Sequence, residues 1–328
     1  MQPTRAQKIW MYERMRLSRR LEETIAKIYL ECTTPAFNMA AGPFPGEMHL
    51  SDGQEPCAVG VCAHLTPTDV VTGPHRAHHI AVAKGVDLKR MVAEIFGKKP
   101  GLSGGRGGHM HIFDPEVNFA CSGIIAQGLG PAVGAALSRK LQGREGVGVA
   151  FCGEGAANQG AFHESLNLAA LWRLPVVFVI EDNAWGMSVP KTLATSVPRN
   201  DVRAAAYGMP GHYVPGNDPL AVFDIAGEAI ARARRGEGPT LIEIETHRLA
   251  GHFMGDAEQY RGKDEVKTLR TKDPILALQA HLQQHENLTP AEDQAIIDRT
   301  ANQVVEAIAF ARAAPYPAPE EALDHVFA

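Results

Sequence analysis

The residues best suited to chemistry stand at the ends of two short apolar segments in the middle of the chain. Residues 147–152 read Val-Gly-Val-Ala-Phe-Cys and end at Gly153-Glu154-Gly155, whereas residues 176–180 read Val-Val-Phe-Val-Ile and end at Glu181-Asp182-Asn183. A carboxylate thus follows the first segment and a carboxamide the second, and Glu154 and Asn183 lie 29 positions apart. Together with a backbone carbonyl, these groups form an all-oxygen ligand set of the kind that Mg²⁺ prefers.

Both segments are predicted to be buried parallel strands joined by one helix. Continuous apolar runs of this length are typical of strands that are covered on both faces. The intervening residues repeat apolar side chains at helical spacing: Ala161, Phe162, Leu166, Ala169 and Ala170. Such a crossover brings both strand ends to the carboxyl edge of a sheet, where open α/β sheets bind ligands. The glycines and the N-terminus of the helix would offer N–H groups to an anion such as a diphosphate.

Two other interpretations compete at this stage. A strand, a Gly-x-Gly turn and a helix also occur in NAD-binding Rossmann folds, where Glu181 or Asp182 would be the acidic residue that ends the next strand. The third small residue of that fingerprint would fall at Asn158, which disfavours an NAD-dependent dehydrogenase. In addition, a Glu that follows a strand is more often a solvated turn residue than a metal ligand. The residues alone therefore leave these possibilities open.

Composition is that of an ordinary soluble enzyme. The 328 residues are 45% hydrophobic and 21% charged, with a net charge of −5, so the chain lacks the basic excess expected of a nucleic-acid partner. The five cysteines are scattered and stand mostly among apolar residues, which favours free thiols in a reducing compartment: Cys32, Cys57, Cys62, Cys121 and Cys152. The N-terminal segment has no apolar signal core, so we expect a cytoplasmic protein without a membrane segment.

Three stretches closely resemble a known cofactor motif. Residues 153–160, 168–175 and 181–183 resemble the thiamine diphosphate motif in the alpha subunits of 2-oxo acid dehydrogenases of the pyruvate, branched-chain and acetoin types. In that family the motif is Gly-Asp-Gly, just under thirty residues, and Asn-Asn. Here Glu154 replaces the first Asp, as in the branched-chain members, and Asp182 replaces the first Asn, whereas Asn183 is retained. The resemblance extends over nearly the whole chain.

The resemblance implies the thiamine diphosphate-binding fold, an α/β fold whose mostly parallel sheet has helices on both faces. We expect helical additions at residues 1–45 and 271–328 around a diphosphate-binding domain at residues 46–270. The terminal patterns agree, because residues 4–31 bear a broad apolar stripe and Thr289-Pro290-Ala291-Glu292 is a capping box. Residues 35–45 are predicted to be a Pro/Gly loop. Residues 240–246, in which Glu alternates with apolar residues, are predicted to be a partly exposed strand.

The implied cofactors are thiamine diphosphate and Mg²⁺. By resemblance, the metal ligands would be Glu154, Asn183 and the carbonyl of Trp185. The other cofactor-binding residues would be His75, Arg76, Gly123, Ile125, Gly153, Gly155 and Ala156. Arg76 suits this role because its planar guanidinium can grip a phosphate with two parallel hydrogen bonds. The Gly123 carbonyl would bind the aminopyrimidine, and Ile125 would be the apolar wedge that folds the cofactor.

The expected catalytic residues are His49, His252 and His78. His49 begins a His-Leu-x-x-Gly-Gln-Glu segment that faces the substrate in the family, and His252 matches the histidine that lies over the cofactor. A zinc site at His75, His78 and His79 is disfavoured, because a ligand from a third segment is missing. The family has Tyr and Gly where this chain has His75 and His79, so the roles of these two stay open. His109 likewise stands where the family commonly has Ser.

The implied activity is cleavage of the C–C bond next to a carbonyl in a 2-oxo acid or acetoin-type substrate, followed by transfer of the acyl group to a lipoyl carrier. The chain is too short to include the second α/β domain that such enzymes need. Expected partners are therefore a beta subunit, in an α₂β₂ heterotetramer, and a lipoyl-bearing acyltransferase. Alternatives are a thiamine diphosphate-dependent carboligase or acyltransferase subunit of a biosynthetic pathway and, more distantly, the NAD-dependent dehydrogenase.

Overall fold

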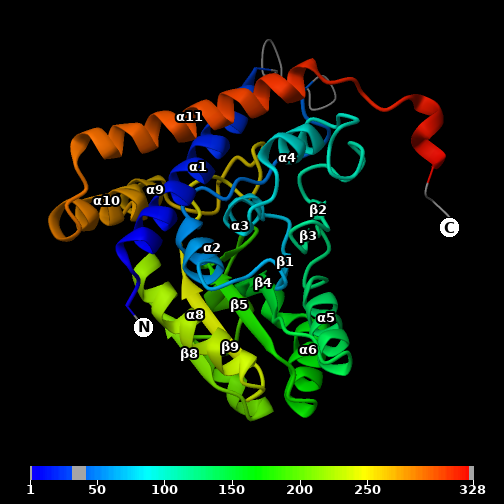
Figure 1. The fold of residues 1–328 in the computed structure, drawn as a ribbon, viewed down its shortest axis with the longest axis vertical. Coiled ribbons are helices and arrows are strands. Elements are labelled where there is room, and N and C mark those ends of the chain that lie inside the picture. The colour runs from blue at the N-terminus through cyan, green and yellow to red at the C-terminus, as the bar shows by residue number, and fades with distance from the viewer. Residues whose placement is uncertain (1, 32–41, 325–328) are drawn as a thin grey trace.

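A seven-stranded sheet runs through the centre of the chain in the computed structural model, which describes residues 2–31 and 42–324 (Figure 1). The strand order is β2-β3-β1-β4-β5-β9-β8, and every pair is parallel except β2 with β3. The strands are β1 Val70–Gly73, β2 Phe113–Asp114, β3 Phe119–Cys121, β4 Gly148–Gly153, β5 Val176–Asp182, β8 Gly211–Val214 and β9 Thr240–Glu245. A separate hairpin pairs β6 Trp185–Gly186 with β7 Val189–Pro190. The mostly parallel sheet is as predicted.

Helices cover both faces of this sheet, which explains the continuous apolar runs. Along β4, Val149 and Phe151 join one apolar core, whereas Ala150 and Cys152 join the other, because successive side chains point to opposite faces. One face is covered by α5 Leu129–Leu141 and α6 Gly160–Leu171, and the other by α2 Glu55–Cys62 and α8 Pro219–Arg234. The predicted fold class is therefore confirmed.

The order of the strands reverses between β1 and β4. From β1 the chain builds β3 and β2 on one side, then crosses through α5 to β4 on the other side. At such a switch point the connections leave the two strands in opposite directions, and a crevice opens at their carboxyl ends. Here β1 ends at Gly73, before Pro74-His75-Arg76, and β4 ends at Gly153, before Glu154. The fold thus brings the predicted Arg and Glu to one crevice.

Long helices from both ends of the chain pack together beside the sheet (Figure 1). The remaining helices are α1 Arg5–Leu30, α3 His78–Lys84, α4 Leu88–Ile95, α7 Lys191–Ala194, α9 Lys263–Arg270, α10 Pro274–His285 and α11 Pro290–Ala313, with 3₁₀ turns at Glu154–Asn158, Asp201–Tyr207 and Pro319–Leu323. Helix α1 packs on α2, α3, α10 and α11, and α11 begins with the predicted capping box of Thr289 and Glu292. These helices share one apolar core with the sheet, and the division at residues 45 and 270 stays a prediction.

The prediction that residues 240–246 form a partly exposed strand is wrong. Strand β9 lies between β5 and β8 and is buried from Thr240 through Ile244. The fully buried Glu243 pairs with Lys191 at 2.8 Å and accepts hydrogen bonds from the backbone N–H groups of Asn200 and Asp201 at 2.6 and 3.1 Å. A buried carboxylate is tolerated when it is satisfied in this way. Its partners lie some forty residues away in sequence, at separations of 52, 43 and 42.

The described cysteines are free, as predicted, namely Cys57, Cys62, Cys121 and Cys152. Cys32 and residues 35–41 of the predicted Pro/Gly loop lie outside the described residues. Among residues 2–31 and 42–324, no helix has the length and apolar character needed to cross a membrane.

One buried aspartate links the start of β1 to β4 and α8. The carboxylate of Asp69 accepts hydrogen bonds from the backbone N–H groups of Thr66 at 2.6 Å and Val147 at 2.8 Å, and it pairs with Arg234 at 2.6 Å. Although burial alone would raise the pKa of Asp69, these donors hold it below the usual value. The ionised carboxylate therefore stabilises the fold.

We expect Asp69→Asn to lower the free energy of unfolding by about 2–3 kcal/mol near neutral pH, because it leaves donors and a partly buried guanidinium without a charged partner. The folded-state pKa is lowered, so this stabilisation is present above the usual aspartate pKa of 3.8 and is lost as the pH falls through the lower folded value. Urea unfolding followed by circular dichroism between pH 3 and 7 would measure both effects. Asp264→Asn, at an exposed carboxylate, is the control. A stability gap of constant size across that range would contradict the role of the charge.

Candidate active site

A cavity of about 390 Å³ occupies the crevice where β1, β4 and β5 end. It brings together ten of the residues predicted from the sequence: His75, Arg76, Ile125, Gly153, Glu154, Gly155, Ala156, Asn183, Trp185 and His252. Gly123 lies between two lining residues, Ser122 and Ile124. Neither His49 nor His78 is among the lining residues. The lining also includes Arg248, which was not singled out from the sequence.

The parallel pairing of β4 with β5 sets the two predicted metal ligands side by side. Gly153 is opposite Glu181 in the register, so Glu154 and Asn183 follow the same edge of the sheet. The Glu154 carboxylate accepts a hydrogen bond from the backbone N–H of Asn183 at 3.3 Å. The side-chain amide of Asn183 donates to Gln54 at 3.0 Å, which fixes the orientation of its oxygen and nitrogen.

Glu154 is a buried carboxylate without a full counter-charge. It is 2% exposed, and burial together with the nearby Asp182 carboxylate raises the pKa of Glu154 to about 7. A divalent cation at this carboxylate would supply the missing positive charge. The available oxygens of Glu154, Asn183 and the Trp185 backbone therefore fit a hard cation such as Mg²⁺.

The turn that follows Asn183 has an unusual backbone. Ala184 and Met187 have φ values of 68° and 57°, in the left-handed region that residues other than glycine rarely adopt. Asp182 stabilises the turn by accepting the backbone N–H of Ala184 at 3.0 Å, and Arg248 donates to the carbonyl of Met187 at 3.1 Å. The carbonyl of Trp185 is thus presented by a turn that its neighbours hold in place.

Asp182, the departure from the family's first Asn, has a cationic partner. It forms an ion pair with Lys191, whose ammonium also lies 2.8 Å from the buried Glu243 carboxylate. These two carboxylates raise the pKa of Lys191 above its usual value against the effect of burial, so the lysine stays charged. Asp182 therefore links the turn to α7 and β9 through Lys191.

Two buried arginines add positive charge to the lining of the cavity. Arg76 is 4% exposed and donates to the backbone carbonyls of Leu50 and, at 2.8 Å, His252. Burial and the neighbouring Arg248 lower the pKa of Arg76 to about 10, so it stays charged at neutral pH. Arg248 is itself 2% exposed and donates to the hydroxyl of Tyr260 at 2.7 Å. Two guanidinium groups that line one cavity favour an anion.

Three histidines from separate segments gather next to these arginines. Ring nitrogens of His49, His75 and His252 lie within 4.8 Å of one another. Burial, and then the neighbouring positive charges, lower the pKa of His75 to about 3 and of His252 to about 4, and that of His49 falls as well. The neutral imidazoles could in principle bind a transition metal. The arginines that lower these pKa values would also repel a cation, so the cluster better suits an anionic or carbonyl-bearing ligand.

His78 and His79 lie behind the cavity and face buried carboxylates. The Nδ1 atom of His78 is 3.0 Å from Glu22, and the Nε2 atom of His79 is 2.6 Å from Glu181. Glu22 belongs to α1 and also accepts the backbone N–H of Ser51 at 3.1 Å. Glu22 was not assigned to the site from the sequence. Its position gave a signal, because Glu22 is a charged residue on the apolar stripe of α1, beside Leu21 and three residues before Ile25.

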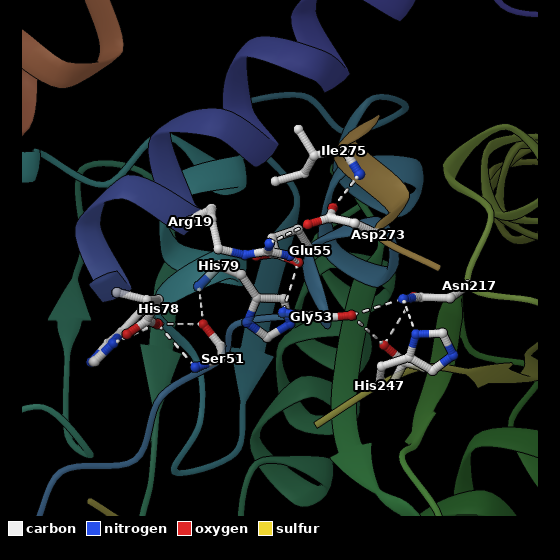
Figure 2. A network of polar contacts seen from close by, with 12 residues as sticks. Arg19, Ser51, Gly53, Glu55, His78, His79, Asn217, His247, Asp273 and Ile275 are labelled. Atoms are coloured by element: carbon white, nitrogen blue, oxygen red, sulfur yellow. Dashed lines mark hydrogen bonds and ion pairs between the residues drawn. The ribbon is translucent and has the colours of Figure 1, made fainter. Parts of the chain in front are cut away.

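A polar network holds the segment of Ser51, Gly53 and Glu55, which directly follows His49 in the sequence (Figure 2). Ser51 lies beside both His78 and His79, and its hydroxyl accepts the backbone N–H of His79 at 3.3 Å. Glu55 accepts the backbone N–H of Gly53 at 2.9 Å and pairs with Arg19 of α1 at 2.6 Å. Arg19 also donates a hydrogen bond of 2.7 Å to Asp273, the N-cap of α10. The terminal helices therefore take part in positioning the site.

The fold and the site define an α/β protein with a cavity, lined by charged groups of both signs, where parallel strands end. Comparison with known proteins identifies the family. Residues 14–320 match the dehydrogenase E1 component family. The chain belongs to this family, and the membership predicted from the sequence is confirmed.

The relatives are named as alpha subunits. The chain is 44% identical to the alpha subunit of acetoin:2,6-dichlorophenolindophenol oxidoreductase from Bacillus subtilis (strain 168), covering 99% of this chain and 94% of that one. It is 39% identical to the chloroplastic pyruvate dehydrogenase E1 component subunit alpha-3 of Arabidopsis thaliana, covering 99% and 75%. It is 34% identical to the somatic, mitochondrial E1 alpha subunit of pyruvate dehydrogenase from Homo sapiens, covering 99% and 80%. The family generally implies thiamine diphosphate as cofactor, and an alpha subunit implies a beta subunit.

We expect Arg76→Lys to weaken the binding of Mg²⁺–pyrophosphate by about 10- to 100-fold, because lysine keeps the charge but loses the fork that makes two parallel hydrogen bonds. Isothermal titration calorimetry with inorganic pyrophosphate would measure the change. Arg90→Lys, at an exposed arginine 3.2 Å from Glu116, is the matched control. Thermal unfolding of both variants would verify that they fold. Equal affinities of folded Arg76→Lys and wild type would show that Arg76 does not bind the anion.

Proposed function

We propose that the chain acts as the alpha subunit of a thiamine diphosphate- and Mg²⁺-dependent dehydrogenase for a 2-oxo acid or acetoin-type substrate, with a lipoyl group as acyl acceptor. The observation that supports this best is the pair of Glu154 and Asn183, which follows neighbouring strand ends and lines a cavity together with two arginines. The comparisons give no support to the biosynthetic carboligase or to the NAD-dependent dehydrogenase.

Different lining residues would bind the metal and the diphosphate in this proposal. Glu154, Asn183 and the Trp185 carbonyl would hold Mg²⁺, while Arg76 and the N–H groups of Gly155 and Ala156 would bind the diphosphate. The remaining cofactor contacts predicted from the sequence, with His75, Gly123, Ile125 and Gly153, are part of the same proposal. When bound, thiamine diphosphate supplies a nucleophilic carbon and an electron sink for cleavage next to a carbonyl.

The histidines would handle protons at the substrate. His252 lines the cavity, and the centroid of the His49 ring lies 4.9 Å from that of the His252 ring. Burial and the neighbouring positive charges lower the pKa values of both histidines, and a diphosphate bound beside the arginines would raise them toward the range useful for general acid–base catalysis. His78, which is hydrogen-bonded to Glu22, would influence the substrate only through neighbouring residues.

An apolar surface beside the cavity suits the proposed beta subunit. The side chains of Ile124 and Ile125 are 62% and 47% exposed, and further exposed apolar residues follow along the same region: Met187, Val189 and Leu193. Large exposed apolar patches of this kind are typical of interfaces. We propose that a beta subunit covers this surface in an α₂β₂ heterotetramer, that a lipoyl-bearing acyltransferase accepts the product, and that the assembly is cytoplasmic.

We expect Glu154→Gln to lower Mg²⁺-dependent binding of thiamine diphosphate by at least about 100-fold, because the amide keeps the size of the side chain but removes the anionic ligand. Calorimetric titration of the alpha–beta complex with thiamine diphosphate, with and without Mg²⁺, would measure this. Glu164→Gln changes an exposed glutamate of the neighbouring helix α6 and should leave binding unchanged. Tight, Mg²⁺-dependent binding by Glu154→Gln would rule out the assignment.

We also expect the purified chain alone to have no more than trace activity in reducing dichlorophenolindophenol with acetoin or pyruvate, and the matching beta subunit to restore it. The reason is that the cavity borders an exposed apolar surface and that residues 2–31 and 42–324 form one large α/β sheet, whereas such an enzyme needs a second α/β domain. Full activity of the chain by itself would contradict the heterotetramer.

A further inference from the structure

His109 makes an unusual pair of contacts with His49. Its Nε2 atom lies 3.1 Å from the backbone nitrogen of His49, which donates to it, and 3.0 Å from the Nδ1 atom of the His49 ring. His109 is only 3% exposed, and its ring stacks on that of His49 at a centroid distance of 5.3 Å. One nitrogen of His109 therefore contacts both the backbone and the side chain of a single residue.

This geometry determines where the protons are. A backbone N–H can only donate, so Nε2 of His109 must be unprotonated in order to accept from it. The Nδ1 atom of His49, which faces the same lone pair, must then bear a hydrogen. A neutral imidazole has only one N–H, so the Nε2 atom of His49 is left bare.

The surroundings keep both rings neutral. Burial, and then the neighbouring His78, His75 and Arg76, lower the pKa of His109 to about 2. Burial, and then His75, Arg76 and the other neighbouring histidines, lower the pKa of His49 as well. His109 thus remains an acceptor over the pH range in which an enzyme works. A ring nitrogen of His49 also lies within 4.8 Å of ring nitrogens of His75 and His252, and both of these residues line the cavity.

We propose that His109 is a positioning residue that holds His49 as the Nδ1–H tautomer, so that Nε2 of His49 accepts a hydrogen bond from a substrate hydroxyl group. A carbonyl or carboxylate oxygen offers no such hydrogen, so this arrangement favours a hydroxyketone over a simple 2-oxo acid. The inference rests on the proposed function for the role of His49 at the substrate, but the tautomer itself does not depend on it.

The tautomer can be measured without any activity. In the full chain labelled with ¹⁵N-histidine, long-range ¹H–¹⁵N spectra distinguish a protonated Nδ1 from a protonated Nε2, and the signals of His49 are assigned by their loss in His49→Gln. We expect Nδ1–H for His49 in the wild type and in His109→Gln, whose amide oxygen can replace the acceptor. In His109→Leu, which has no acceptor, we expect a mixture of tautomers. An Nε2–H tautomer in the wild type, or no change in His109→Leu, would overturn the inference while leaving the proposed function intact.

Kinetics of the alpha–beta complex would test the consequence for substrates. We expect His109→Leu to lower kcat for acetoin by about 10- to 100-fold, at the lower end of what a positioned proton acceptor contributes, and to lower kcat for pyruvate far less. His109→Gln should recover most of the acetoin activity, and the affinity for thiamine diphosphate should be unchanged in both variants. Equal losses on the two substrates, a failure of His109→Gln to recover activity, or no acetoin turnover by the wild type would overturn the role of the hydroxyl group. If the wild-type complex did not bind thiamine diphosphate, the proposed function itself would be contradicted.

Discussion

The parallel pairing of β4 and β5 is the constraint on which the site depends. Both strands are covered by apolar cores on each face, so a slip of one residue in their register would place every side chain on the wrong face. The register that satisfies both cores sets Gly153 opposite Glu181, and the residues that follow are Glu154 and Asn183. The packing of the interior thereby determines the spacing of two polar side chains at the edge of the sheet. Arg76 reaches the same edge because β1 is the other neighbour of β4.

The cavity combines charges of both signs that lack full partners within the chain. Burial and Asp182 oppose the ionisation of Glu154 and raise its pKa to about 7, while Arg76 keeps its charge in the same cavity. Such groups destabilise the folded chain on its own and are stabilised by a ligand of complementary charge. A magnesium diphosphate presents a cation to the carboxylate and an anion to the guanidinium. The polarity of the cavity therefore matches both ends of one ligand.

Patterns that arise from local chemistry could be predicted from the sequence, whereas patterns that depend on distant partners could not. The apolar runs of β4 and β5 predicted buried strands because burial on both faces requires apolar side chains throughout. Residues 240–246 were misjudged because the buried Glu243 is satisfied by Lys191 and the backbone of residues 200–201, which no local pattern indicates. The site residues from separate segments were placed by family resemblance. The link between His109 and His49 joins positions 60 residues apart and became apparent only from the geometry.

The buried carboxylate of Glu22 shows how far the site extends into the rest of the molecule. It reaches from α1 to Ser51 and His78, and Arg19 of the same helix reaches Glu55 and Asp273. An N-terminal helix of this kind cannot be exchanged freely between related enzymes, as a peripheral module could. A chimaera that received this helix from a paralogue with a neutral residue at position 22 would lack the carboxylate of Glu22. The imidazole of His78 and the hydroxyl group of Ser51 would then lose this hydrogen-bond partner. Recombination among such subunits should therefore keep α1 together with the segment from Ser51 to His78 that it contacts.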